Sequence, residues 1–169
     1  MFSRFKQHLQ DMRTIKTLCE GAEGQARKAG QELPGAEHYV LAALELDDGS
    51  AQKVFGRLGK EPEAYRKALA GQHGEALRKL GIDAGGVGEP QPVAGKPAAL
   101  FDSQPSGQAL MQALPELAKR SQAPLCGAHV LLAAAGMPHS LAARALRAMG
   151  VEPQALALAA EEELGMAHA

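Results

Sequence analysis

Two short segments of the sequence place a histidine where it could support binding or catalysis. The first is Ala36-Glu37-His38, in which a carboxylate precedes an imidazole, and the second is Ala128-His129, which lacks the acid. Two equivalent histidines invite a metal-binding or catalytic hypothesis, because imidazole is a common metal ligand and general base. The alternative, which the sequence favours, is a structural histidine that hydrogen-bonds a neighbouring loop near the start of a helix.

The rest of the sequence offers little catalytic or metal-binding chemistry. Cys19 and Cys126 form no Cys-x-x-Cys pair, so both are expected to be buried small hydrophobic groups, and no metal is expected. Asp47-Asp48 can be interpreted as half a cation site or, more simply, as a solvated turn. Because no nucleophile, base and orienting group are recognisable together, we predict no catalytic residue, no enzymatic activity and no cofactor.

The segments that must position these residues repeat along the chain. Aligning His38 with His129 gives an offset of 91 residues (129 − 38), and the same offset pairs Pro62 with Pro153. Both prolines suit the first turn of a following helix, where a missing amide hydrogen costs nothing. Upstream of the histidines the best offset is 92, which predicts that the second copy lacks the counterpart of Glu37. The pattern indicates an internal duplication.

Composition and periodicity both indicate an all-α fold. Helix-forming residues are abundant, whereas aromatic residues make up 4% of the chain and Trp is absent. The segments that begin at Ser50 and Ser140 each place apolar residues at i, i+3, i+4 and i+7. The two serines are candidate N-caps, and Gly59 and Gly150 suit left-handed positions after the helix ends.

Each copy therefore contains about four helices. We predict a first repeat over residues 1–82, a Gly- and Pro-rich linker over 83–102, a second repeat over 103–164 and a frayed tail over 165–169. Gly71 and Gly74 are expected to interrupt or weaken a helix over 63–80, and Pro115 to kink a helix over 105–120.

The repeated pattern resembles the N-terminal domain of the Clp ATPases, most closely the ClpC and ClpA type. The family repeat reads Gly-His-x-x-Ile-Gly-Thr-Glu-His-hydrophobic-Leu-Leu, then an acidic or Gly-rich turn and Leu-Gly. This chain has Gly30-Gln31-Glu32-Leu33-Pro34-Gly35-Ala36-Glu37-His38-Tyr39-Val40-Leu41, then Asp47-Asp48-Gly49 and Leu58-Gly59. The similarity covers about residues 1–163.

The resemblance implies two pseudo-two-fold-related four-helix repeats that form one eight-helix bundle. It also implies a non-catalytic protein- or peptide-binding module of the Clp proteolysis and chaperone system, which recognises degrons, substrates or adaptors. Partners would be protein or peptide substrates, Clp ATPases or adaptor proteins, and the oligomeric state stays open. The sequence has no Gly-x-x-x-x-Gly-Lys-Ser/Thr (Walker A) motif. We therefore expect a freestanding protein or, alternatively, the substrate-recognition N-domain of a longer Clp unfoldase subunit.

The resemblance also implies a ligand site in the repeated turn. In the ClpC type the acidic residue of this turn contacts the guanidinium of phosphorylated arginine, which would make Glu37 the main ligand-binding residue. A carboxylate matches a planar guanidinium with two charge-assisted hydrogen bonds. The simpler interpretation is that Glu37 stabilises the start of a helix. Ala36, His38, Ala128 and His129 complete the candidate set, and the site is expected to be asymmetric.

Charge and hydropathy exclude some partners. The net charge of −1 provides no basic field for nucleic acid, and no long apolar run indicates a signal peptide or a membrane span, so a cytoplasmic location is predicted. The amphipathic start, with Phe2, Phe5, Leu9 and Met12, could lie on a membrane surface but is short and weakly basic. We favour the prediction that this segment packs on the first repeat, as the resemblance to the Clp N-terminal domain implies.

Overall fold

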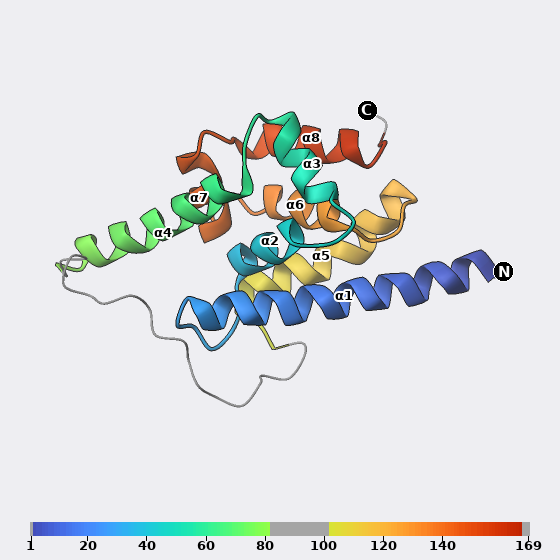
Figure 1. Ribbon diagram of the computed structural model, residues 1–169, viewed down its shortest axis with the longest axis horizontal. Helices are drawn as coiled ribbons and strands as arrows, with labels where there is room; N and C mark the ends of the chain where they lie inside the picture. Colours follow the sequence, from blue (N-terminus) through green and yellow to red (C-terminus); the bar gives the residue numbers. More distant parts are fainter. Residues whose placement is uncertain (1, 82–101, 167–169) are drawn as a thin grey trace.

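The computed structural model describes residues 2–81 and 102–166, and within these ranges the chain is entirely helical (Figure 1). The helices are α1 (Phe2–Lys28), α2 (Ala36–Leu44), α3 (Ser50–Arg57), α4 (Pro62–Lys79), α5 (Pro105–Ser121), α6 (Gly127–Ala135), α7 (Leu141–Ala148) and α8 (Pro153–Glu163). The prediction of an all-α fold with eight helices is confirmed for the described residues.

Two short helices, α2 and α6, form the centre of the bundle. Every residue of α2 is buried, and in α6 only Ala135 is not. A helix that is apolar on all sides must be covered on all sides. Accordingly α1 and α5 pack on one side of this central pair, and α3, α7 and α8 pack on the others (Figure 1).

Most of the predicted helix boundaries are confirmed. Gly59 and Gly150 have φ angles of 66° and 83°, the left-handed conformation expected after a helix end. Pro62 and Pro153 lie in the first turns of α4 and α8. Ser140 caps α7, because its hydroxyl accepts a hydrogen bond of 3.1 Å from the amide of Ala143.

Ser50 differs from this prediction. It is the first residue of α3 rather than its N-cap, because Gly49 takes the cap position with a φ of 68°. The Ser50 hydroxyl instead donates to Asp48 and accepts a hydrogen bond of 2.8 Å from the amide of Ala128, at the start of α6. A residue expected to act within its own helix therefore joins the two halves of the chain.

The central helices also correct the predicted alignment of the two copies. Both α2 and α6 have nine residues, with His38 and His129 at the third position of each. Glu37 and Ala128 both occupy the second position, so Ala128 is the counterpart of Glu37 and the missing residue lies upstream of the helix. The equal lengths agree with a duplication, while the two-fold relation between the halves stays a prediction.

Other parts of the predicted organisation are only partly described. Residues 82–101 contain nearly all of the predicted linker, and residues 167–169 belong to the predicted tail; both lie outside the described residues. Within the described part, α4 runs unbroken through Gly71 and Gly74, and α5 continues through Pro115. The predicted interruption of α4 is therefore wrong.

The N-terminal half of α1 does not pack on the first repeat. The four apolar residues expected to be buried there are largely exposed: Phe2 86%, Phe5 63%, Leu9 42% and Met12 55%. The first buried residue of α1 is Leu18, and the helix projects beyond the rest of the bundle (Figure 1). In the described residues, no helix combines the length and the apolar character needed to cross a membrane.

Candidate functional site

The five candidate residues all lie in the first turns of the central helices. Ala36, His38, Ala128 and His129 are 0% exposed, and Glu37 is 3% exposed. The structure thus brings Glu37 and His38 together on α2 but places neither at the surface. Recognition of phosphorylated arginine by Glu37 stays a prediction, and it would require the first turn of α2 to open.

The Glu37 carboxylate folds back over the N-cap of its own helix. Its Oε1 atom lies 3.5 Å from Nδ1 of His38, and a Cβ atom at Gly35 would lie only 2.5 Å from Oε2. Glycine at position 35 therefore leaves the space that the carboxylate occupies. Burial raises the pKa of Glu37, and its own backbone amide, His73 and Arg144 only partly oppose that rise.

The two histidines accept the same hydrogen bond. Nδ1 of His38 accepts from the amide of Gly35 at 2.9 Å, and Nδ1 of His129 accepts from the amide of Cys126 at 3.1 Å. Since each is an acceptor at Nδ1, each neutral imidazole carries its hydrogen on Nε2. Burial lowers the pKa of His38 to about 4 and also lowers the pKa of His129. These contacts are those of structural histidines.

The two histidines differ in the contacts of their second ring nitrogen, Nε2. Nε2 of His129 lies 2.7 Å from the hydroxyl of Ser121, to which it donates. Nε2 of His38 has no hydrogen-bond partner among the described residues, although it is fully buried. An unpaired buried donor is destabilising, so the first turn of α2 is less well satisfied than that of α6.

The prediction that both cysteines are buried is confirmed for Cys19 and wrong for Cys126, which is only partly buried and lies beside His129. Sγ of Cys126 lies 3.4 Å from Nδ1 of His129, and Ser121 is bonded to the other side of the ring. Cys126 does not line the groove described below, and Nδ1 already accepts the Cys126 amide. Metal-binding groups of three or more His, Cys, Asp or Glu residues were not found among residues 2–81 and 102–166.

The start of each central helix is capped from the other half of the chain. Oδ2 of Asp48 accepts a hydrogen bond of 3.2 Å from the amide of Gly127, which adds to the contact made by Ser50. At α2, the hydroxyl of Ser106 accepts from the amide of Ala36 at 3.1 Å. Asp48 is therefore a capping residue rather than part of a cation site or a merely solvated turn.

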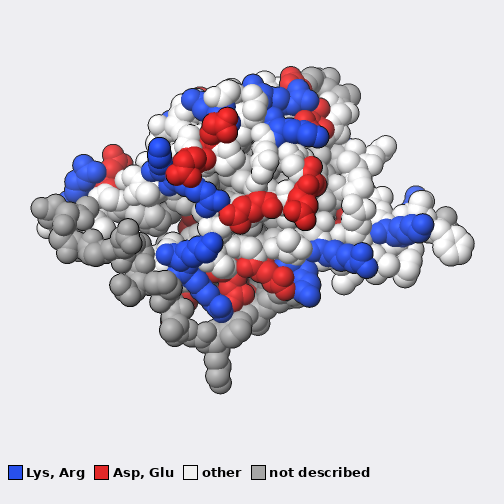
Figure 2. Space-filling model, in the orientation of Figure 1, with Lys and Arg blue, Asp and Glu red and all other residues white. Residues whose placement is uncertain are grey.

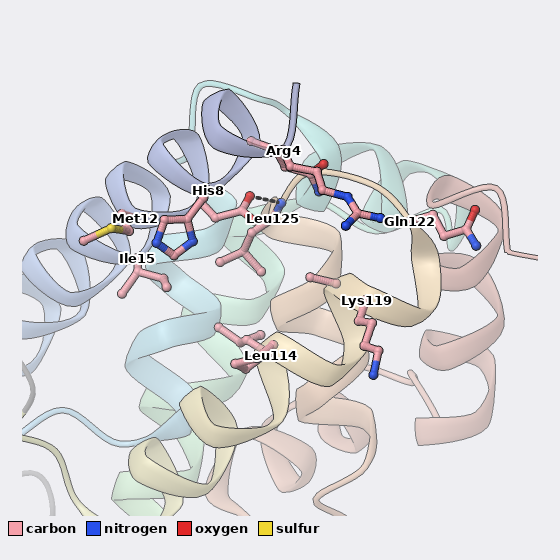
Figure 3. A pocket seen from close by; sticks show the side chains of 12 residues that line it. Arg4, His8, Met12, Ile15, Leu114, Lys119, Gln122 and Leu125 are labelled. Atoms are coloured by element: carbon pink, nitrogen blue, oxygen red, sulfur yellow. Dashed lines mark hydrogen bonds between the residues drawn. The ribbon is translucent and has the colours of Figure 1, made fainter. Parts of the chain in front are cut away.

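A groove lies between the N-terminal half of α1 and the C-terminal half of α5 (Figure 3). It has a volume of about 600 Å³. The apolar part of its lining consists of Met12, Ile15, Leu114, Pro115, Ala118 and Leu125. Leu114 and Leu125 belong to the hydrophobic core, so the groove opens directly onto the packed interior.

Polar side chains surround the apolar part of the groove. Oδ1 of Asp11 accepts a hydrogen bond of 2.8 Å from the amide of Leu125, which fixes α1 against the segment that follows α5 (Figure 3). Arg4 extends toward Gln122, and Lys119 lies on the α5 side (Figure 3). No ion pair within the described residues involves Arg4 or Lys119, so both cations are available to a ligand.

None of the candidate site residues predicted from the sequence lines this groove. Its two walls lie about a hundred residues apart in the chain, at positions such as Asp11 and Leu125. The one available signal was the amphipathic start of the chain, which contributes Met12 to the groove. No pattern in the sequence indicates which side of that helix faces α5.

Comparisons with known proteins do not assign the chain to a family. No protein-family model matches the sequence, and no curated protein matches it either. The resemblance to the Clp N-terminal domain therefore stays a prediction that depends on the repeated motifs.

Proposed function

We propose that this chain is a non-catalytic protein- or peptide-binding module that holds a peptide segment in the groove between α1 and α5. The observation that carries the proposal is the groove itself, with an apolar lining and a few polar groups at its edge. Such a composition is usual for binding sites. Each wall comes from a different predicted repeat.

The charges at the groove define the class of peptide. Arg4 and Lys119 provide two cations without partners in the described residues, while Asp11 already accepts the amide of Leu125. A ligand that places apolar side chains over Leu114 and Ile15 and a carboxylate near these cations would satisfy both features. The carboxylate can belong to Asp, Glu or the end of a peptide chain.

The repeated motifs support placing this binding activity in the Clp proteolysis and chaperone system. The peptide would then be a degron, a substrate segment or part of an adaptor, and the binding partner a Clp ATPase or adaptor in the cytoplasm. The groove supplies no reason to expect turnover, since its lining contains no paired nucleophile and base.

The experiment is selection of displayed random peptides on the intact chain, followed by affinity measurement on variants. Lys119→Glu should weaken binding of selected peptides by about tenfold, because it replaces an attractive charge by a repulsive one. Arg120→Glu is the matched control, because it makes the same change of charge at the adjacent residue of α5. Arg120 does not line the groove. Ala118→Arg fills the groove and should abolish binding.

The proposal fails if Lys119→Glu and Arg120→Glu have equal effects and Ala118→Arg is silent. Recovery of Clp components from a lysate, lost with Ala118→Arg, would support the placement in the Clp system. Peptide binding without Clp components would leave the binding module standing and remove that placement.

A further inference from the structure

The projecting half of α1 carries an apolar stripe that nothing in the described structure covers. We call Phe2, Phe5, Leu9 and Met12 the α1 seam; each is between 42% and 86% exposed. Their spacing of three, four and three residues equals the a and d positions of two successive heptads. The next a position is Lys16, and the next d position, Cys19, is buried in the core, so the seam ends where α1 enters the bundle.

The surface beside the seam has the form of a coiled-coil contact. Lys6 and Arg13 occupy the e positions of the two heptads. A shallow depression is lined by Lys6, Leu9, Gln10 and Arg13. These residues are related as i, i+3, i+4 and i+7, the four-residue arrangement that receives one side chain of a partner helix.

Charge disfavours a second copy of this chain as the occupant. Residues 2–16 contain four basic residues and one acidic residue, a net charge of +3 (4 − 1), whereas the whole chain has −1. In an antiparallel pair of α1 seams, Lys6 of one copy would face Arg13 of the other, and the repulsion disfavours that pairing. Figure 2 shows basic side chains along the projecting helix, with acidic ones gathered nearer the middle of that face.

The shape of the seam disfavours a membrane surface. At 100° per residue the four side chains span an arc of only about 80°, narrower than the wide apolar face of a core-facing or interfacial helix. The arc is that of a coiled-coil seam, and the stripe covers about three turns. A partner helix matches both the width and the periodicity.

We propose that the α1 seam docks an amphipathic helix of a partner protein, with apolar a and d residues and acidic residues facing Lys6 and Arg13. The seam is separate from the groove and shares only Met12 with it, so the inference does not depend on the proposed function. Burial of Leu18, Ala22 and Ala26 anchors the rest of α1 in the bundle. The α1 helix is therefore formed before the partner binds, which lowers the entropic cost of so short a contact.

The test uses two synthetic helical peptides of equal length on the full chain, followed by fluorescence anisotropy. Both carry Leu at a and d; one has Glu and the other Lys at e and g. The acidic peptide should bind about tenfold more tightly than the basic one. Phe5→Glu should abolish binding, while Leu158→Glu, at an exposed leucine of α8, should not change it. Circular dichroism of each variant checks that the bundle is intact.

The double variant Lys6→Glu with Arg13→Glu separates docking from simple apolar adhesion. Its preference should invert, so that the basic peptide binds several-fold more tightly than the acidic one. Equal affinities for both peptides in both proteins would overturn the proposal. It would also be overturned by Phe5-dependent binding to phosphatidylserine vesicles without peptide binding, or by a Phe5-dependent dimer in sedimentation. Lys119→Glu, which tests the groove, should leave peptide binding to the seam unchanged.

Discussion

The first turns of α2 and α6 carry the same histidine at the same position, but they satisfy their polar groups differently. His129 uses both ring nitrogens, on Cys126 and Ser121, whereas His38 leaves Nε2 without a partner in the described structure. Beside them, α6 has Ala128 and α2 has the buried carboxylate of Glu37. The comparison teaches that the first turn of α6 pairs both nitrogens of its histidine, while the first turn of α2 buries one ring nitrogen without a partner in the described part of the chain, at a cost in stability.

Transfer of the acid to α6 should produce the largest effect. Ala128 is 0% exposed, and the N-cap of α6 is Cys126, whereas the glycine N-cap of α2 leaves room for the Glu37 carboxylate. Ala128→Glu should therefore lower the free energy of unfolding by about 3 kcal/mol or more, through overpacking and burial of a polar group. Urea unfolding measures this change. A loss below about 1 kcal/mol would mean that the two turns are interchangeable.

Removal of each histidine should reveal the unequal hydrogen bonding. His129→Ala breaks two hydrogen bonds, leaves the Cys126 amide without its acceptor and removes a fully buried ring, so we expect a loss of about 3 kcal/mol. His38→Ala breaks one hydrogen bond and removes an unpaired donor, so its loss of stability should be smaller than that of His129→Ala by about 1 kcal/mol. Thermal and urea unfolding of both variants under one buffer give the difference. Equal losses would contradict the assigned contacts of Nε2.

The capping contacts at the start of α6 should contribute more to stability than those at the start of α2. Asp48 accepts a hydrogen bond at the start of α6 and another from Ser50, whereas the hydroxyl of Ser106 accepts from a single amide of α2. Asp48→Ala should cost about 2 kcal/mol and Ser106→Ala about 1 kcal/mol. Hydrogen exchange at the Gly127 and Ala36 amides reports each cap separately. Faster exchange at both sites in one variant would indicate that the caps are not independent.

The smallest effect concerns the ionisation of Glu37 and has the opposite sign. Burial raises its pKa above the usual value of 4.5, so its contribution to stability is fullest below pH 4.5 and is lost as the pH rises through the raised pKa. Glu37→Gln removes this loss and should stabilise the protein by roughly 1 kcal/mol at pH 7. The gain should shrink at pH 4. A gain that is independent of pH would exclude ionisation as its cause.

Local sequence signals predicted local structure well. Gly59 and Pro62 mark a helix end and the next helix start because their backbone chemistry acts within one turn. The apolar periodicity after Ser50 and Ser140 predicted α3 and α7 because a buried stripe follows the helical repeat. Such signals need no knowledge of the rest of the chain.

Contacts between distant segments were not predictable in the same way. Serine is a favoured N-cap residue, but Gly49 takes the N-cap position of α3. The hydroxyl of Ser50 is therefore free to accept a hydrogen bond from the amide of Ala128. The groove needs Asp11 beside Leu125, and the seam on α1 is apolar without being buried. A hydrophobic pattern shows that a helix has an apolar face, but it does not show whether this chain or a partner covers it.

The central claim is that recognition takes place in the groove between α1 and α5 rather than at the first turn of α2. Amide chemical shifts of the labelled chain, titrated with a peptide selected by display, test it most directly. We predict the largest changes at Ile15, Ala118, Lys119 and Leu125, with the amides of Gly35 and His38 nearly unchanged. Changes centred on Gly35, Glu37 and His38, with the groove silent, would contradict the account.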